Sequence, residues 1–230
     1  MISERGGRIS GMARIFWIIL AILLPFAAKG AISLLETPQT VSPGYLSAGL
    51  GGTALVGISG DNTDTTNVTT VNMAACGELW LKTGITPRLD IGVSAGVGSR
   101  YLEACARYGI IEDYLSAGAG FQIGYGSQKG NLAAQVSLFG GLPGKLLSPY
   151  AILHYRYLFF NQPDADTGSS WHTVTGALGL AIRPNECLSF YVEAGGWYGG
   201  FPENLLKEPA YPGITAGAGV TFDFPVKVSM

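Results

Sequence analysis

The feature that most constrains the fold is the position of the charged residues within strand-like segments. From about Gly44 to Phe224 the chain reads as ten short runs in which polar and apolar residues alternate. In each run the charged residues fall on the polar parity; in 101–110, for example, Glu103 and Arg107 share one parity and only apolar residues occupy the other. Because successive strand side chains point to opposite faces, each run has one uncharged face and one polar face.

Ten such runs predict an all-β fold, a transmembrane antiparallel up-and-down β-barrel of about ten strands with both termini in the periplasm. A soluble barrel has the same period, but the polar face that it turns to water is rich in Lys and Glu. Here that face is mostly Gly, Ser, Thr, Asn and Gln, and only 13% of the chain is charged, against about a quarter in soluble domains. The expected strands are Gly44–Ser59, Val71–Thr83, Arg88–Gly98, Tyr101–Ile110, Tyr114–Gly126, Asn131–Gly141, Pro149–Phe160, Trp171–Arg183, Leu188–Gly199 and Gly213–Phe224.

The segment before the barrel has the form of an export signal. Ile15–Ala28 is the one long apolar run, two Arg residues precede it, and small residues follow it near Gly30. We therefore expect residues 1–30 to be a signal peptide for Sec-type export, 31–43 a linker, 44–224 the barrel and 225–230 a tail. An uncleaved anchor helix is the alternative, but about 14 residues are few for a span.

The connections between strands alternate in length. Residues 61–70, 161–170 and 200–212 form long loops rich in Asn, Asp, Gly or Pro, and tight turns such as 84–87 and 184–187 lie between them. Outer-membrane barrels place short turns in the periplasm and longer loops outside. The three long segments are thus the expected outer loops and the candidate sites for an extracellular ligand.

The polar parity carries charges of both signs, which are expected to point into the lumen. Such a balanced set favours a salt-bridge network over a selective ion channel, which uses a ring of one sign. Inward glycines point the other way, since they leave room for water, and the sequence leaves both readings open. The predicted lumen network consists of Glu78, Lys82, Asp90, Glu103, Arg107, Arg156, Glu193 and Asp223.

Aromatic residues gather near the strand ends, as in the girdles that amphipathic rings form at membrane interfaces. Ordinary β-propensity is the alternative explanation. The predicted girdle residues are Tyr45, Tyr125, Tyr150, Phe159, Trp171, Tyr198, Phe222 and Phe224.

The last strand, Ile214–Phe224, resembles the C-terminal strand of bacterial outer-membrane barrels. Those strands end on an aromatic residue with apolar residues at every second position before it, which here are Val220, Phe222 and Phe224. The resemblance implies a location in the bacterial outer membrane, with its lipids and the barrel assembly machinery as partners. The tail 225–230 departs from the pattern, because many such proteins stop at the aromatic residue.

Few residues suggest chemistry. Removal of residues 1–30 lowers the basic count from 14 to 10 and the acidic count from 16 to 15, a net charge of −5, which excludes an electrostatic case for nucleic acid. His172 near the outer rim, or His154 in the lumen, could serve a hydrolase, and Asp164 and Asp166 lie near His172 in sequence. We expect no enzyme, cofactor, metal site or disulfide.

Three functions therefore remain from sequence. The first is a structural or surface-interaction role through the outer loops. The alternative is a narrow passive, porin-like pore. An outer-membrane hydrolase is the third and weakest.

Overall fold

The computed structural model describes residues 37–61, 68–97, 101–124, 131–160, 169–200 and 211–226. The signal peptide expected at 1–30 and most of each long loop lie outside these residues. Within them the chain forms ten strands, as predicted: β1 Tyr45–Asp61, β2 Val68–Thr86, β3 Leu89–Val97, β4 Tyr101–Ile111, β5 Leu115–Gly124, β6 Asn131–Gly141, β7 Leu147–Phe160, β8 Ser169–Asn185, β9 Leu188–Gly200 and β10 Tyr211–Pro225. The described part of the chain contains no helix long and apolar enough to cross a membrane.

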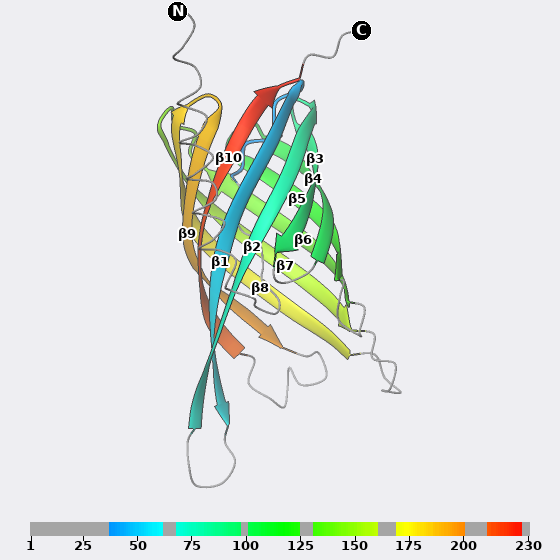
Figure 1. The fold of residues 1–230 in the computed structure, drawn as a ribbon, viewed down its shortest axis with the longest axis vertical. Helices are drawn as coiled ribbons and strands as arrows, with labels where there is room; N and C mark the ends of the chain where they lie inside the picture. The colour runs from blue at the N-terminus through cyan, green and yellow to red at the C-terminus, as the bar shows by residue number, and fades with distance from the viewer. Residues whose placement is uncertain are drawn as a thin grey trace, which may run out of the picture.

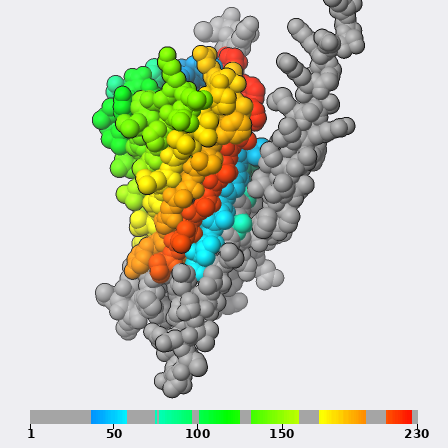
Figure 2. All heavy atoms as spheres, turned by 90° about the vertical axis from the view of Figure 1, so that its left-hand side faces the viewer, coloured from blue at the N-terminus to red at the C-terminus, as the bar shows by residue number. Residues whose placement is uncertain are grey.

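The strands close into a single barrel in which all neighbouring strands are antiparallel. Neighbours are consecutive in sequence, except where β1 and β10 pair at the seam. At the seam, thirteen residue pairs run from Tyr45 opposite Pro225 to Gly57 opposite Gly213. Figures 1 and 2 show β10, in red, beside the blue and cyan of β1. The start of β1 and the end of β10 therefore share one end of the barrel, here called the terminal mouth, and the other end is the loop end.

The hairpin of β1 and β2 is longer than its neighbours. The two strands stay paired as far as Asp61 opposite Val68, whereas the pairing of β2 with β3 ends at Gly77 opposite Val97. The segment Val68–Cys76 is therefore paired with β1 alone, and Figure 1 shows the tip of the hairpin extending past the other strands at the loop end. The sequence placed the start of this strand at Val71, so the extension is longer than predicted.

The two faces of the barrel divide the side chains as the alternation predicts. In β4 exposure alternates along the strand, with Glu103 and Arg107 buried and Leu102 and Tyr108 exposed. Large apolar side chains face outward from β2 to β10, and Leu178 is 72% exposed. An apolar outer surface and a polar, buried interior together are the arrangement of a membrane β-barrel.

Candidate functional site

Arg107 is the centre of the contacts near the terminal mouth. Its Nε and Nη2 both donate to Oδ2 of Asp90, at 3.2 and 2.6 Å, and its Nη1 donates to the carbonyl oxygen of Thr37. The guanidinium carbon also lies 5.7 Å from the centre of the Phe139 ring, within the range of a cation–π contact. Asp90 is 2% exposed. Two strands and the N-terminal segment thus meet at one buried ion pair.

Residues 37–43, here called the strap, lie at the terminal mouth, and Thr37 and Pro38 are buried. Its other ties are a hydrogen bond of 2.9 Å from Val41 N to Asp90 Oδ2, one of 3.0 Å from Thr40 Oγ1 to Pro87 O, and one from Arg183 to Gln39. Arg183 lies on β8 and Asp90 on β3, so the strap is held from two separate strands. The sequence predicted only a linker over 31–43, and the described part of it is instead packed against the barrel.

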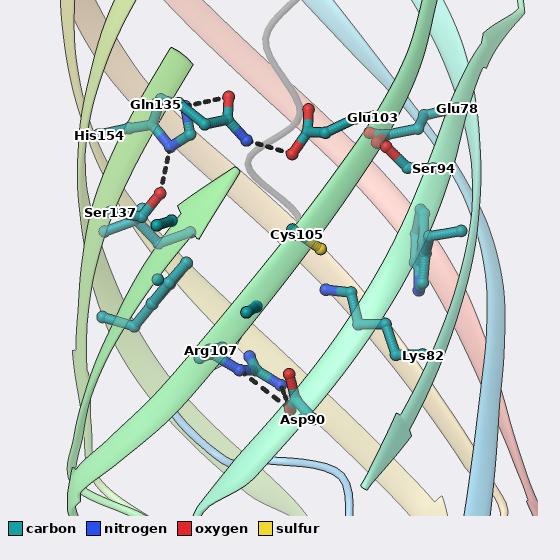
Figure 3. A pocket seen from close by; sticks show the side chains of 16 residues that line it. Glu78, Lys82, Asp90, Ser94, Glu103, Cys105, Arg107, Gln135, Ser137 and His154 are labelled. Carbon is teal, nitrogen blue, oxygen red and sulfur yellow. Dashed lines mark hydrogen bonds and ion pairs between the residues drawn. The ribbon is translucent and has the colours of Figure 1, made fainter. Parts of the chain in front are cut away.

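A relay of hydrogen bonds joins β4, β6 and β7 above the ion pair (Figure 3). Gln135 donates through Nε2 to Glu103 and faces Nε2 of His154 with its Oε1, at 3.0 Å. Because an amide oxygen only accepts, Nε2 of His154 is the donor in this contact, and its Nδ1 lies 2.7 Å from Ser137 Oγ. The relay thus connects side chains of three strands.

An aromatic layer fills part of the lumen. The buried cluster contains Trp80, Phe139, Tyr150, Ile152, Ala177, Ala181 and Tyr191. Within it the rings of Tyr150 and Tyr191 meet edge to face, 6.5 Å apart, and Tyr150 donates to Glu193 Oε1 at 2.5 Å. Tyr150 was predicted for the membrane girdle; that prediction is wrong, because Tyr150 is 4% exposed and points into the lumen.

Inward glycines lie directly opposite several of these rings. Gly49 pairs with Trp80 across β1 and β2, and Gly179 pairs with Tyr150 across β7 and β8. A Cβ on Gly49 would lie 2.2 Å from the Trp80 ring, and one on Gly179 would lie 2.3 Å from the Tyr150 ring. These two glycines therefore make room for aromatic rings, and not for water, which answers the question that the sequence left open at these positions.

A small cavity remains between the relay and the ion pair. Figure 3 shows Glu103, Gln135 and His154 at one end of it, Arg107 and Asp90 at the other, and Lys82 and Cys105 between them. The volume open to the centres of water molecules is about 30 Å³. About 10–15 Å³ suffices for one water, so the cavity accommodates a few waters.

The structure buries seven of the eight residues predicted for the lumen network, and Asp223 is partly exposed at the end of β10. The ion pair of Arg107 with Asp90 joins two of them directly. The sequence did not identify the amide and hydroxyl partners Gln135, Ser137 and Thr37, nor a lumen function for His154 within such a relay. For Gln135, Ser137 and His154 inward parity was the available signal, but alternation alone does not tell which inward groups meet. Thr37 lies before the first strand, where alternation gives no signal.

The predicted girdle residues fall into three groups. Phe159, Tyr198 and Phe224 are exposed on the outward face, and Phe222, also outward, is partly exposed. Tyr45 is 41% exposed at the terminal mouth, on the parity of the buried Ser47. The side chains of Tyr125 and Trp171 lie outside those that the structure describes. On β10, Val220, Phe222 and Phe224 share the outward face, and their assembly role stays a prediction.

His172 lies on the outward face of β8, away from the relay. Its Nδ1 shares a hydrogen bond with the hydroxyl of Tyr155 at 2.5 Å, and its ring centre lies 4.6 Å from that of Tyr157. Asp164 and Asp166, its suggested acidic partners, lie outside the described residues. The contacts of His172 that the structure shows are therefore with aromatic neighbours of β7.

The described side chains form neither a cluster of metal ligands nor a disulfide. No group of three or more His, Cys, Asp or Glu residues there could hold a metal ion. Neither Cys105 in the lumen nor Cys187 in the turn before β9 forms a disulfide.

No protein-family model matches the chain, and no curated protein matches it. Solved structures resemble it in architecture. An outer membrane channel from Pseudomonas putida F1 shares 10% identity over 84% of this chain and 100% of that one, with a TM-score of 0.49. The outer membrane protease OmpT from Escherichia coli shares 10% identity over 82% of this chain and 100% of that one, with a TM-score of 0.43. The attachment invasion locus protein of Yersinia pestis shares 14% identity over 79% of this chain and 99% of that one, with a TM-score of 0.34. All three come from bacterial outer membranes, and their names describe different activities.

The glycine opposite Trp80 generates a test. Gly49→Ala should destabilise the barrel by about 1–3 kcal/mol, because the new methyl group forces the ring out of its place. The measurement is the urea midpoint of unfolding in detergent micelles. Gly109→Ala is the matched control, since its Cβ would meet nothing closer than 3.7 Å. Equal midpoints for the two variants would contradict the role given to Gly49.

The ion pair generates a second test. Arg107→Ala should lower the temperature at which the folded form is lost on a gel, because Asp90 would remain buried without its cation, a loss of about 3–5 kcal/mol. Arg88→Ala, which removes an exposed charge two residues before Asp90, should leave that temperature unchanged. An Arg107→Ala protein that unfolds like the wild type would show that water reaches and solvates Asp90.

Proposed function

We propose that the protein is an outer-membrane β-barrel that acts through interactions at the cell surface. In this proposal the lipids of the outer membrane surround the barrel, the assembly machinery inserts it, and a ligand outside the cell binds at the loop end. The long segments 61–70, 161–170 and 200–212 are the proposed contact regions. The observation that carries the proposal is the extension of the β1–β2 hairpin beyond the barrel wall, together with a lumen that is filled below it.

The outward face supports the membrane location. Leu102, Val136 and Leu178 are each more than half exposed, on β4, β6 and β8, so apolar groups cover well-separated strands of the barrel. Soluble monomers rarely expose contiguous apolar patches larger than a few hundred Å². Lipid is the solvent in which such a surface is favourable, and a bacterial barrel of this kind belongs to the outer membrane.

The side chains and the strap that occupy the lumen favour an interaction role over the role of an open porin. The aromatic layer, the buried ion pair and the strap all lie in the path through the barrel on the side of the terminal mouth. The cavity between the relay and the ion pair holds only a few waters. Sugars and other nutrients that porins admit are much larger than this cavity.

The hairpin supports a surface role because it is structure that a plain barrel does not need. The nine residues Val68–Cys76 are paired on one side only. The pairing of β1 with β10 ends at Gly57, so Ile58–Asp61 and Val68–Val71 run past both neighbouring strands. At about 3.3 Å per residue, this tip extends about 13 Å beyond β10 along the strand, and it presents backbone groups and side chains to a partner beyond the barrel rim.

Shortening the hairpin tests the proposal. Replacing residues 59–70 by Asn-Gly closes the turn between Ile58 and Val71, which are already paired. Cells that display the shortened protein should lose adhesion to a panel of immobilised matrix proteins and glycans, while the barrel keeps its heat-dependent gel mobility. Equal adhesion by the shortened and full-length proteins, or a large steady conductance of the full-length protein in planar bilayers, would contradict the proposal.

The orientation can be tested separately. In a chain with Cys187→Ser, a cysteine introduced at Asp64 or Asp166 should react with a membrane-impermeant maleimide on intact cells. A cysteine at Lys145, in the exposed turn between β6 and β7, should react only after the outer membrane is opened. The reverse pattern would place the terminal mouth outside the cell.

A further inference from the structure

We propose that the strap is a latch, and that its release opens a narrow conduit for water and small inorganic ions along one wall of the lumen. This activity goes beyond surface interaction and does not depend on it. The inference rests on how bulk is distributed around the lumen, on what forms the floor of the cavity, and on how the strap is joined to β1.

The strands β3, β4 and β5 contribute no ring to the buried aromatic cluster. Its rings are Trp80, Phe139, Tyr150 and Tyr191, from β2, β6, β7 and β9. On β3, β4 and β5 the inward positions include many small residues, and these strands line the cavity together with Trp80, Phe139 and Ile152. The small inward residues of the three strands are Gly92, Ser94, Gly96, Cys105, Gly109, Ser116, Gly118 and Gly120.

The floor of the cavity is the attachment site of the strap. Arg107 and Asp90 line the cavity at the end nearer the terminal mouth. The same two side chains hold the carbonyl oxygen of Thr37 and the N–H group of Val41. The path from the cavity to the terminal mouth is therefore closed by the strap and by the residues that grip it.

The cavity lining, floor included, carries charges of both signs. Glu78, Glu103 and Asp90 supply negative charge, and Lys82 and Arg107 supply positive charge. A one-sign ring is the usual device of charge selection in pores, and this mixed lining lacks it. The conduit should therefore pass small cations and anions with little preference.

The strap joins the barrel through a glycine suited to a hinge. Gly44 has a φ of +80°, in the left-handed region that glycine adopts without strain. A Cβ there would meet nothing within 4 Å, so backbone conformation and not space favours glycine. Val226 N donates to Gly44 O at 2.7 Å, which holds the hinge to the end of β10 while the strap ahead of it is held by polar contacts.

A disulfide lock tests the latch in the full chain. Thr40→Cys and Pro87→Cys place two thiols at neighbouring positions, since Thr40 Oγ1 donates to the backbone carbonyl oxygen of Pro87 at 3.0 Å; the three native cysteines are changed to Ser. Asp90→Ala then removes the carboxylate that holds Val41. In planar bilayers with potassium chloride, the oxidised variant with Asp90→Ala should conduct like the parent, which is the oxidised two-cysteine chain that keeps Asp90. Reduction of the variant should raise its conductance at least tenfold.

Two further variants keep the result decisive. Val41→Pro removes the N–H donor to Asp90 without touching the lumen charges, and should open the conduit in the same way if Asp90→Ala fails to fold. Glu186→Gln, an exposed charge in the turn before β9, is the control and should leave conductance at the parent level. After reduction, maleimide labelling of the cysteine at position 40 reports whether the strap has left its site.

The outcomes divide cleanly. Conductance that rises only after reduction, together with labelling at position 40, supports the latch. A labelled strap without a rise in conductance overturns it, because the aromatic layer would then close the lumen alone. A strap that stays protected in both release variants also overturns it, because the contact with Asp90 would not be what holds the strap.

Discussion

The absence of hydrogen-bonding partners in the bilayer core is the constraint on which this structure depends. Each backbone N–H and C=O group at membrane depth must be paired within the protein, and only a helix or a closed sheet achieves that. The seam between β1 and β10 completes the closure here. Once the sheet is closed, the period of two assigns each residue to lipid or to the lumen, so the lumen becomes the place for charge.

Confinement then decides what those charges do. A ten-stranded barrel is only slightly wider than the eight-stranded size that side chains can fill, and a buried carboxylate such as Asp90 is costly unless it is paired. Arg107 meets that need from the neighbouring strand, and it also binds the strap and lies over the Phe139 ring. The lumen therefore resembles the core of a soluble protein in its packing, with ion pairs and amides among aromatic rings.

The sequence predicted the ten strands well because lipid allows no exception to the uncharged face, so the pattern is strict in every run. It predicted the inward charges for the same reason. It failed for Tyr150, since the lumen accepts rings wherever a neighbouring strand supplies glycine, and an aromatic residue near a strand end satisfies both readings. It also missed the packing of the strap, because Thr37, Pro38 and Gln39 show no periodicity.

The pairing of rings with glycines has a consequence for how such a barrel can change over time. Gly49 and Trp80, and likewise Gly179 and Tyr150, sit at facing positions of adjacent strands. Neither member of a pair can be replaced freely while the other stays, so each pair behaves as one inherited unit. In homologous chains the two positions should covary, and a pair of glycine and aromatic columns would mark the strand register even where the overall sequence has diverged.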